Sequence, residues 1–133
     1  MCVASSTLFL LNAALCYYYG FYVYFTLFTI LTITSILFHT TPNSHPHKHI
    51  YNIIDKSAVL AVVLYGAYTL WTNWHKYTAK SRLIIIGTFL STIILFSGGY
   101  MFRVFCYHPV WGNMWHSLLH IVSVVGHGLL VIS

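Results

Sequence analysis

Two histidines near the C-terminal end of the sequence, His116 and His120, stand four positions apart in the run HSLLH. On a helix this spacing places both imidazoles on one side, one turn apart. It is a spacing with which a helix gives two ligands to one Zn²⁺ ion. Histidines at a membrane interface also serve as plain hydrogen-bonding groups, so the pair alone does not decide whether a metal binds here.

A third imidazole, His39, ends a long apolar stretch in the run SILFH. We expect His39 to join the other two as a metal ligand. Three protein nitrogens and one water form a typical catalytic zinc site, because the fourth position stays open for chemistry. Zinc suits three imidazoles better than Ca²⁺ or Mg²⁺, which prefer oxygen, whereas iron or copper would also accept them.

The sequence contains a single acidic side chain, Asp55. A carboxylate at membrane depth is costly, so it usually has a partner and a purpose. Asp55 could orient or deprotonate a metal-bound water, or it could pair with Lys48 or Lys56 at the interface. Ser35, one helical turn before His39, could donate a hydrogen bond to an oxyanion or bond back to a helix carbonyl. Asp55 and Ser35 are therefore the candidate catalytic residues.

The remaining histidines are weaker candidates for metal ligands. His45, His47 and His49 alternate through a loop, where they could recruit a metal but more often would be solvated. His127 lies seven residues beyond His120, two helical turns further along, and a packing role is favoured for it.

The composition indicates an integral, multi-pass membrane protein. Hydrophobic residues make up 59% of the 133 residues, charged residues only 5%, and the mean hydropathy is +0.77. Soluble domains carry about 25% charged residues. The net charge of +5 comes from basic residues that stand singly in short loops, where they would meet lipid headgroups. No basic run resembles a nucleic-acid groove, so we expect no nucleic-acid partner. Three cysteines without CxxC spacing predict neither a disulfide framework nor a thiolate site.

A spanning helix needs about 20 residues, which limits this single domain to about five. Gly20, within a tyrosine-rich run, permits a turn, and Pro42 and Pro46 break the chain again. The fold class is therefore all-α, a polytopic membrane helix bundle. The expected helices are residues 3–19, 22–40, 50–72, 83–102 and 114–132.

The order of these helices places the candidate residues on one side of the membrane. The helix at 22–40 ends on the face where the next begins, and two further crossings return the chain to the start of the last helix. His39, Asp55, His116 and His120 therefore lie near the same face. The helix assignment did not impose this result, so it supports a shared site.

In order, S35-I-L-F-H39, Asp55 and H116-S-L-L-H120 resemble the motifs of the CREST superfamily. That superfamily includes alkaline ceramidases, progestin and adipoQ receptors, haemolysin III proteins and GPI-remodelling lipid hydrolases. The run from Asp55 to the G-x-Y-T element at 66–69 is most similar to the haemolysin III and adipoQ receptor branch.

The resemblance implies Zn²⁺ on His39, His116 and His120, with Asp55 and Ser35 around the activated water. It also implies hydrolysis of an amide or ester in a membrane lipid, a ceramide-like amide being favoured. Members usually have seven spanning helices rather than five. Loss of one hairpin before the last helix would keep the order of faces and remove part of the cavity wall, which a homo-oligomer would restore.

Two other functions remain open. The chain could be a receptor-like or pore-forming membrane protein that keeps zinc for structure. It could also be a small haem protein with histidines from two helices as axial ligands, although Asp55 would then have no role.

Overall fold

A computed structural model describes residues 2–101 and 109–133, and within these ranges all regular structure is helical. The fold is an all-α membrane bundle, as the sequence predicts. In chain order its elements are α1 (Cys2–Ser6), α2 (Phe9–Tyr18), α3 (Tyr22–Thr40), α4 (Lys48–Thr72), the 3₁₀ turn η1 (Trp74–Lys76), α5 (Ala79–Met101) and α7 (Pro109–Ile132).

Among the described residues, four helices are long and apolar enough to cross a membrane. These candidate spans are Tyr22–Thr40, Lys48–Thr72, Ala79–Gly99 and Val110–Ile132. Their length and composition fit a multi-pass membrane protein, because about 20 residues cross the hydrocarbon core. The apolar stretch Val3–Tyr18 is shorter than these four.

The prediction of one continuous first helix at residues 3–19 is wrong, because the chain breaks at Thr7 and Leu8 into α1 and α2. Backbone bonds between residues three apart mark the break, from Leu8 to Ser5, from Leu10 to Thr7 and from Leu11 to Leu8. Bonds of this 3₁₀ type tighten the chain locally. Thr7 also donates its hydroxyl to the carbonyl of Ala4 at 2.7 Å.

Two breaks occur where the sequence places them. Gly20 has a φ of +78° in the turn between α2 and α3, a conformation that residues with a side chain rarely adopt. The loop after α3 contains Pro42 and Pro46 and is closed by Lys48, whose ammonium group donates to the carbonyls of Phe38 and Thr41. Lys48 thereby satisfies carbonyl groups at the C-terminal end of α3.

Three helices begin earlier than the sequence predicts. α4 starts at Lys48 rather than near 50. α5 starts at Ala79 because Thr78 accepts the backbone N–H of Ser81 at 3.1 Å, which is N-capping geometry. α7 starts at Pro109, and proline is well suited to the first turn of a helix. The predicted loop residues Arg103, Cys106 and His108 lie outside the described residues.

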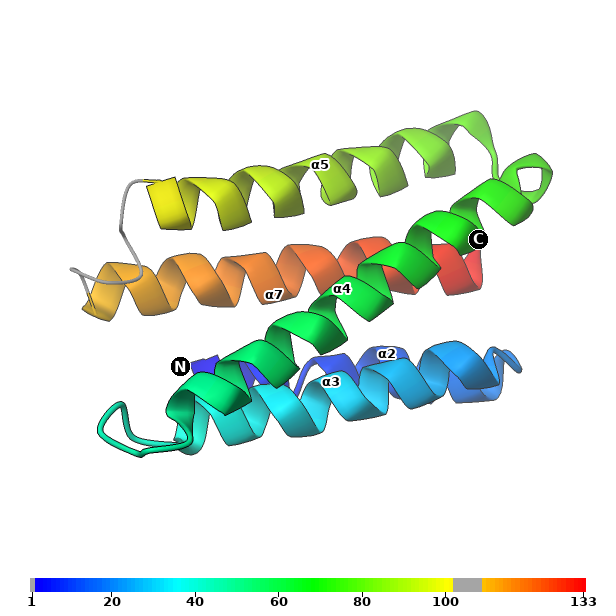
Figure 1. Ribbon diagram of the computed structural model, residues 1–133. Helices are drawn as coiled ribbons and strands as arrows, with labels where there is room; N and C mark the ends of the chain where they lie inside the picture. Colours follow the sequence, from blue (N-terminus) through cyan, green and yellow to red (C-terminus); the bar gives the residue numbers. More distant parts are fainter. Residues whose placement is uncertain (1, 102–108) are drawn as a thin grey trace.

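α7 packs between α5 and the N-terminal helices α1 and α2. α7 packs on α5 and also contacts α1 and α2, while α3 packs between α2 and α4 (Figure 1). Trp115 ties α7 to α5 by donating to the carbonyl of Leu95 at 2.6 Å. Tyr77 donates to the carbonyl of Leu130 at 2.8 Å, and burial raises the pKa of Tyr77, so the phenol remains a donor.

The buried core lies between α2, α3, α4 and α7. Cys16, Tyr24 and Phe28 have no exposed surface, and Val62 is nearly fully buried. In contrast, α4 and α5 are not a closely packed pair. They meet at the η1 connection and diverge toward the N-terminal end of α4 (Figure 1). Side chains of both helices, Val59 of α4 and Phe96 of α5 among them, line a cavity that the histidines also line.

Candidate metal centre

The structure brings His39, His116 and His120 together across α3 and α7. One ring nitrogen from each histidine lies within 4.8 Å of those of the other two. The ring centroids are 4.9 Å apart for His39 and His116, 4.6 Å for His116 and His120, and 5.9 Å for His39 and His120. The α-helical spacing and the order of the helices predicted this grouping.

The donor set suits a zinc-like ion. Nε2 of His39 is a buried atom that finds no hydrogen-bond partner within the described residues. A buried polar atom of this kind normally has a partner, and a metal ion would supply one. Zn–N bonds of about 2.0–2.1 Å place two ligand nitrogens about 3.4 Å apart. Small rotations of the imidazoles would therefore close the set around one ion.

His120 is held by a residue that sequence reasoning missed. Ser5 in α1 lies 2.9 Å from Nδ1 of His120 through its hydroxyl, and His120 is only 4% exposed. With a proton on Nδ1, His120 donates to Ser5 and presents the lone pair of Nε2. Metal-ligating histidines are commonly fixed through their second ring nitrogen in this way. Ser5 and Ser6 interrupt an otherwise apolar run, which was the available signal.

Ser35 faces the same cavity but is bonded to Ser6 rather than standing alone. The two hydroxyl oxygens are 2.9 Å apart, and either can be the donor. Both side chains are buried. When Ser6 donates to Ser35, the proton of Ser35 is available for a different acceptor. The oxyanion role of Ser35 stays a prediction, and the two contacts show that α1 lies against two of the candidate residues, His120 and Ser35.

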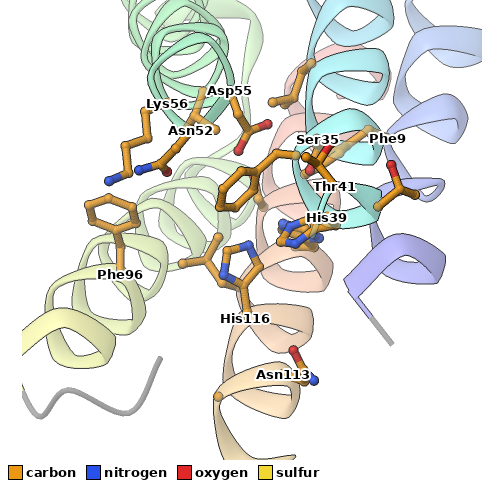
Figure 2. A pocket seen from close by; sticks show the side chains of 18 of the residues that line it. Phe9, Ser35, His39, Thr41, Asn52, Asp55, Lys56, Phe96, Asn113 and His116 are labelled. Carbon is orange, nitrogen blue, oxygen red and sulfur yellow. The ribbon is translucent and has the colours of Figure 1, made fainter. Parts of the chain in front are cut away.

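Asp55 is 7% exposed and comes from the first half of α4. Its Oδ1 accepts a long hydrogen bond of 3.4 Å from the hydroxyl of Thr34 in α3. Figure 2 shows the carboxylate pointing from α4 into the space that Ser35, His39 and His116 face from other helices. Asp55 and the three histidines line the same cavity, so a carboxylate is available there to hold or remove a proton.

All five predicted site residues line one cavity of about 620 Å³. That volume is within the range of small-molecule sites, which is about 300–1,000 Å³. Its apolar part includes Leu31, Val59, Val62, Phe96 and Leu119. His39, Asp55, His116 and His120 therefore lie around one cavity, as the order of the helices predicts, and their place at one face of a membrane stays a prediction.

The other predicted histidines stand apart from this cluster. His45 and His47 are exposed in the loop, with ring centroids 5.6 Å apart, and His49 is exposed in the first turn of α4. His127 is 6% exposed and bonds through Nδ1 to the hydroxyl of Tyr24. His127 therefore has the packing role that its position predicts.

Comparison with known proteins identifies no relative. No protein-family model matches the chain, and neither curated proteins nor solved structures provide a match. Functional inference therefore depends on the geometry of the three histidines, Asp55 and the cavity.

Proposed function

We propose that this chain is an integral-membrane, zinc-dependent hydrolase that cleaves an amide or ester bond of a membrane lipid. The observation that carries the proposal is the group of three imidazoles, with ligand nitrogens within 4.8 Å, in a cavity that also contains the only acidic residue of the sequence. His39, His116 and His120 would hold the ion. Zinc in such a site makes water acidic and polarises a carbonyl group.

Asp55 would act as the general base. Its carboxylate faces the cavity from α4, and a positioned base of this kind contributes about 10²–10⁴-fold to a rate. Asp55 would take a proton from the attacking water and return it to the leaving group. Ser35, oriented by Ser6, would donate a hydrogen bond to the oxygen that gains negative charge.

The surroundings of the site support a lipid substrate. The cavity is lined by apolar side chains of helices that have membrane-spanning length, including Leu31, Val59 and Phe96. A ceramide-like amide is the leading substrate and a phospholipid ester the next. Resemblance to the CREST superfamily supports this choice through the order of Ser35, His39, Asp55 and the HSLLH motif.

Elemental analysis of the purified protein is the deciding experiment. We expect about one zinc per chain, and loss of zinc in the His116→Ala/His120→Ala double variant. A screen of lipid amides and esters follows with the same two samples. A well-folded protein without zinc would contradict the hydrolase.

A full complement of zinc without turnover of any lipid would favour a receptor-like or pore-forming protein with a structural metal. The contact between the three imidazole rings argues against the haem alternative, because His116 lies against both His39 and His120. A porphyrin would have to occupy that space. An absorption spectrum without a Soret band would agree with this reading.

A further inference from the structure

The cavity has a positively charged end, formed by one stripe of α4. Lys48, Asn52 and Lys56 are spaced four residues apart, so they lie on one side of the helix, and all three line the cavity. The same helix turns apolar further along, where Val59 and Val63 line the cavity. One face of α4 thus changes from cationic to apolar along its length.

Other walls of the cavity add neutral polar groups, Thr41 and Asn43 from the loop and Asn113 from α7. Asp55 is the only carboxylate that could offset the two lysines, because the sequence contains no other acidic side chain. The polar end of the cavity therefore has a positive balance and suits an anion.

The apolar end continues between α4, α5 and α7. A second, small cavity of about 40 Å³ shares Val63, Thr92 and Ser123 with the first and extends to Leu130. The two cavities therefore adjoin, and apolar lining continues from the first toward Leu130. An alkyl chain would bury its surface there at about 25 cal/mol per Å².

The charged stripe also lies where α4 and α5 diverge. Figure 2 shows Lys56 and Asn52 of α4 beside Phe96 of α5, with His39 and His116 further inside. Because α4 and α5 are not closely packed, a lipid could reach the cavity sideways from the bilayer. Its headgroup would then pass next to Lys56.

We propose that the lipid bound here has an anionic, phosphate-bearing headgroup, which Lys56 and Asn52 recognise while the chain follows Val59, Val62 and Val63. The inference deepens the proposed hydrolase by naming the class of headgroup. Binding, unlike hydrolysis, does not require the metal, so the two can fail separately.

Native mass spectrometry of the full chain in detergent can test this with lipids that differ only by the phosphate. The probes are ceramide phosphate against ceramide, and phosphatidic acid against diacylglycerol. We expect the phosphate to tighten binding by about tenfold or more, as a charge-assisted hydrogen bond allows. Lys56→Gln should remove most of that preference.

Lys76→Gln is the matched control. It removes the same charge from an exposed residue of η1, which is away from the cavity. Lys48 is not used for the test, because its ammonium group also closes the loop after α3. A phosphate preference that falls equally in Lys56→Gln and Lys76→Gln would reflect general charge and overturn the proposal.

A second set of measurements tells whether the phosphate binds to Lys56 or to the metal, since zinc could itself attract a phosphate. The measurements are repeated with the His116→Ala/His120→Ala variant. We expect the phosphate preference to persist there. If the preference disappears in that variant and survives Lys56→Gln, the phosphate binds the metal and the proposal is wrong. If it persists without any zinc in the wild type, the lipid site stands and the hydrolase fails.

Inorganic phosphate distinguishes a lipid headgroup from a free anion. It lacks the chain, so it should compete with ceramide phosphate only at a much higher concentration. Equal competition by inorganic phosphate would contradict a site built for a lipid.

Discussion

At the scale of single residues, the candidate centre depends on side chains from opposite ends of the sequence. His120 lies against Ser5, and Ser35 lies against Ser6, so α1 stabilises both a ligand and a candidate catalytic residue. Ser5 and His120 are 115 positions apart. The N-terminal helix is therefore part of the centre even though it supplies none of the three histidines.

Ser5→Ala should weaken the metal without removing it. Loss of a partner to a ligating histidine typically costs about 10–100-fold in metal affinity. Competition between the protein and a chelator measures this affinity, and Thr26→Ala is the control because its exposed hydroxyl bonds to the Tyr22 carbonyl of its own helix. Unchanged affinity in Ser5→Ala would show that Ser5 does not position His120.

Replacement of His39 or His116 by Ala should abolish metal binding altogether. Each would supply one of the three nitrogens of the proposed site, and two imidazoles make a far weaker site for zinc. Zinc content per chain by elemental analysis is the measurement. His75→Ala, at an exposed residue of η1, should keep a full complement. Retention of zinc in His39→Ala would show that α3 supplies no ligand through His39.

Asp55→Asn should keep the metal and lose turnover by about 10²-fold or more, since an amide cannot accept the proton. The amide keeps the size of the side chain and can still contact Thr34. Zinc content and the rate of lipid cleavage, measured on the same preparation, separate the two effects. Full activity in Asp55→Asn would exclude the general-base role.

At the scale of helices, a glycine in α4 makes room for a buried pair. A Cβ at Gly66 would lie 2.8 Å from Cε1 of His127 and 2.8 Å from the hydroxyl of Tyr24. Tyr24 is fully buried and bonded to His127, so neither ring can move aside easily. The close contact between α3, α4 and α7 at this level thus requires the glycine.

Gly66→Ala should destabilise the bundle by about 1–3 kcal/mol, the usual cost of overpacking. Gly87→Ala is the matched control, because a Cβ there meets no atom within 4 Å and alanine favours the helix. Unfolding in mixed detergent and denaturant would compare the free energies of unfolding. A Gly66→Ala protein as stable as Gly87→Ala would contradict tight packing at this level.

The sequence predicts the helices where a strong local signal exists and fails where tertiary contacts decide. Gly20 and Pro42 predict two breaks because their backbone preferences are local. The break at Thr7 consists of backbone bonds between residues three apart, and hydropathy does not predict these bonds. His39 and His120 could be grouped from helix order, whereas their partners in α1 could not.

At the scale of the whole molecule, the number of crossings decides whether the three histidines can meet. α3 ends and α4 begins beside the loop at residues 41–47, and α5 returns the chain toward the start of α7 (Figure 1). His39 and His116 share a face only because two crossings, α4 and α5, separate them. The proposed site therefore requires that the loop before α4 and the start of α7 lie on the same side of the membrane.

A cysteine at Asn43 and a cysteine at Lys76 should be labelled from opposite sides of the membrane. Both positions are exposed, and only α4 lies between them. In a background without the three native cysteines, Asn43→Cys should react with an impermeant maleimide in sealed vesicles of one orientation, and Lys76→Cys only after permeabilisation or inversion.

Asn113→Cys, near the start of α7, should follow Asn43→Cys, because α4 and α5 together return the chain to that face. Labelling of Asn113→Cys with Lys76→Cys instead would mean an odd number of crossings between His39 and His116. The three imidazoles could not then share one ion.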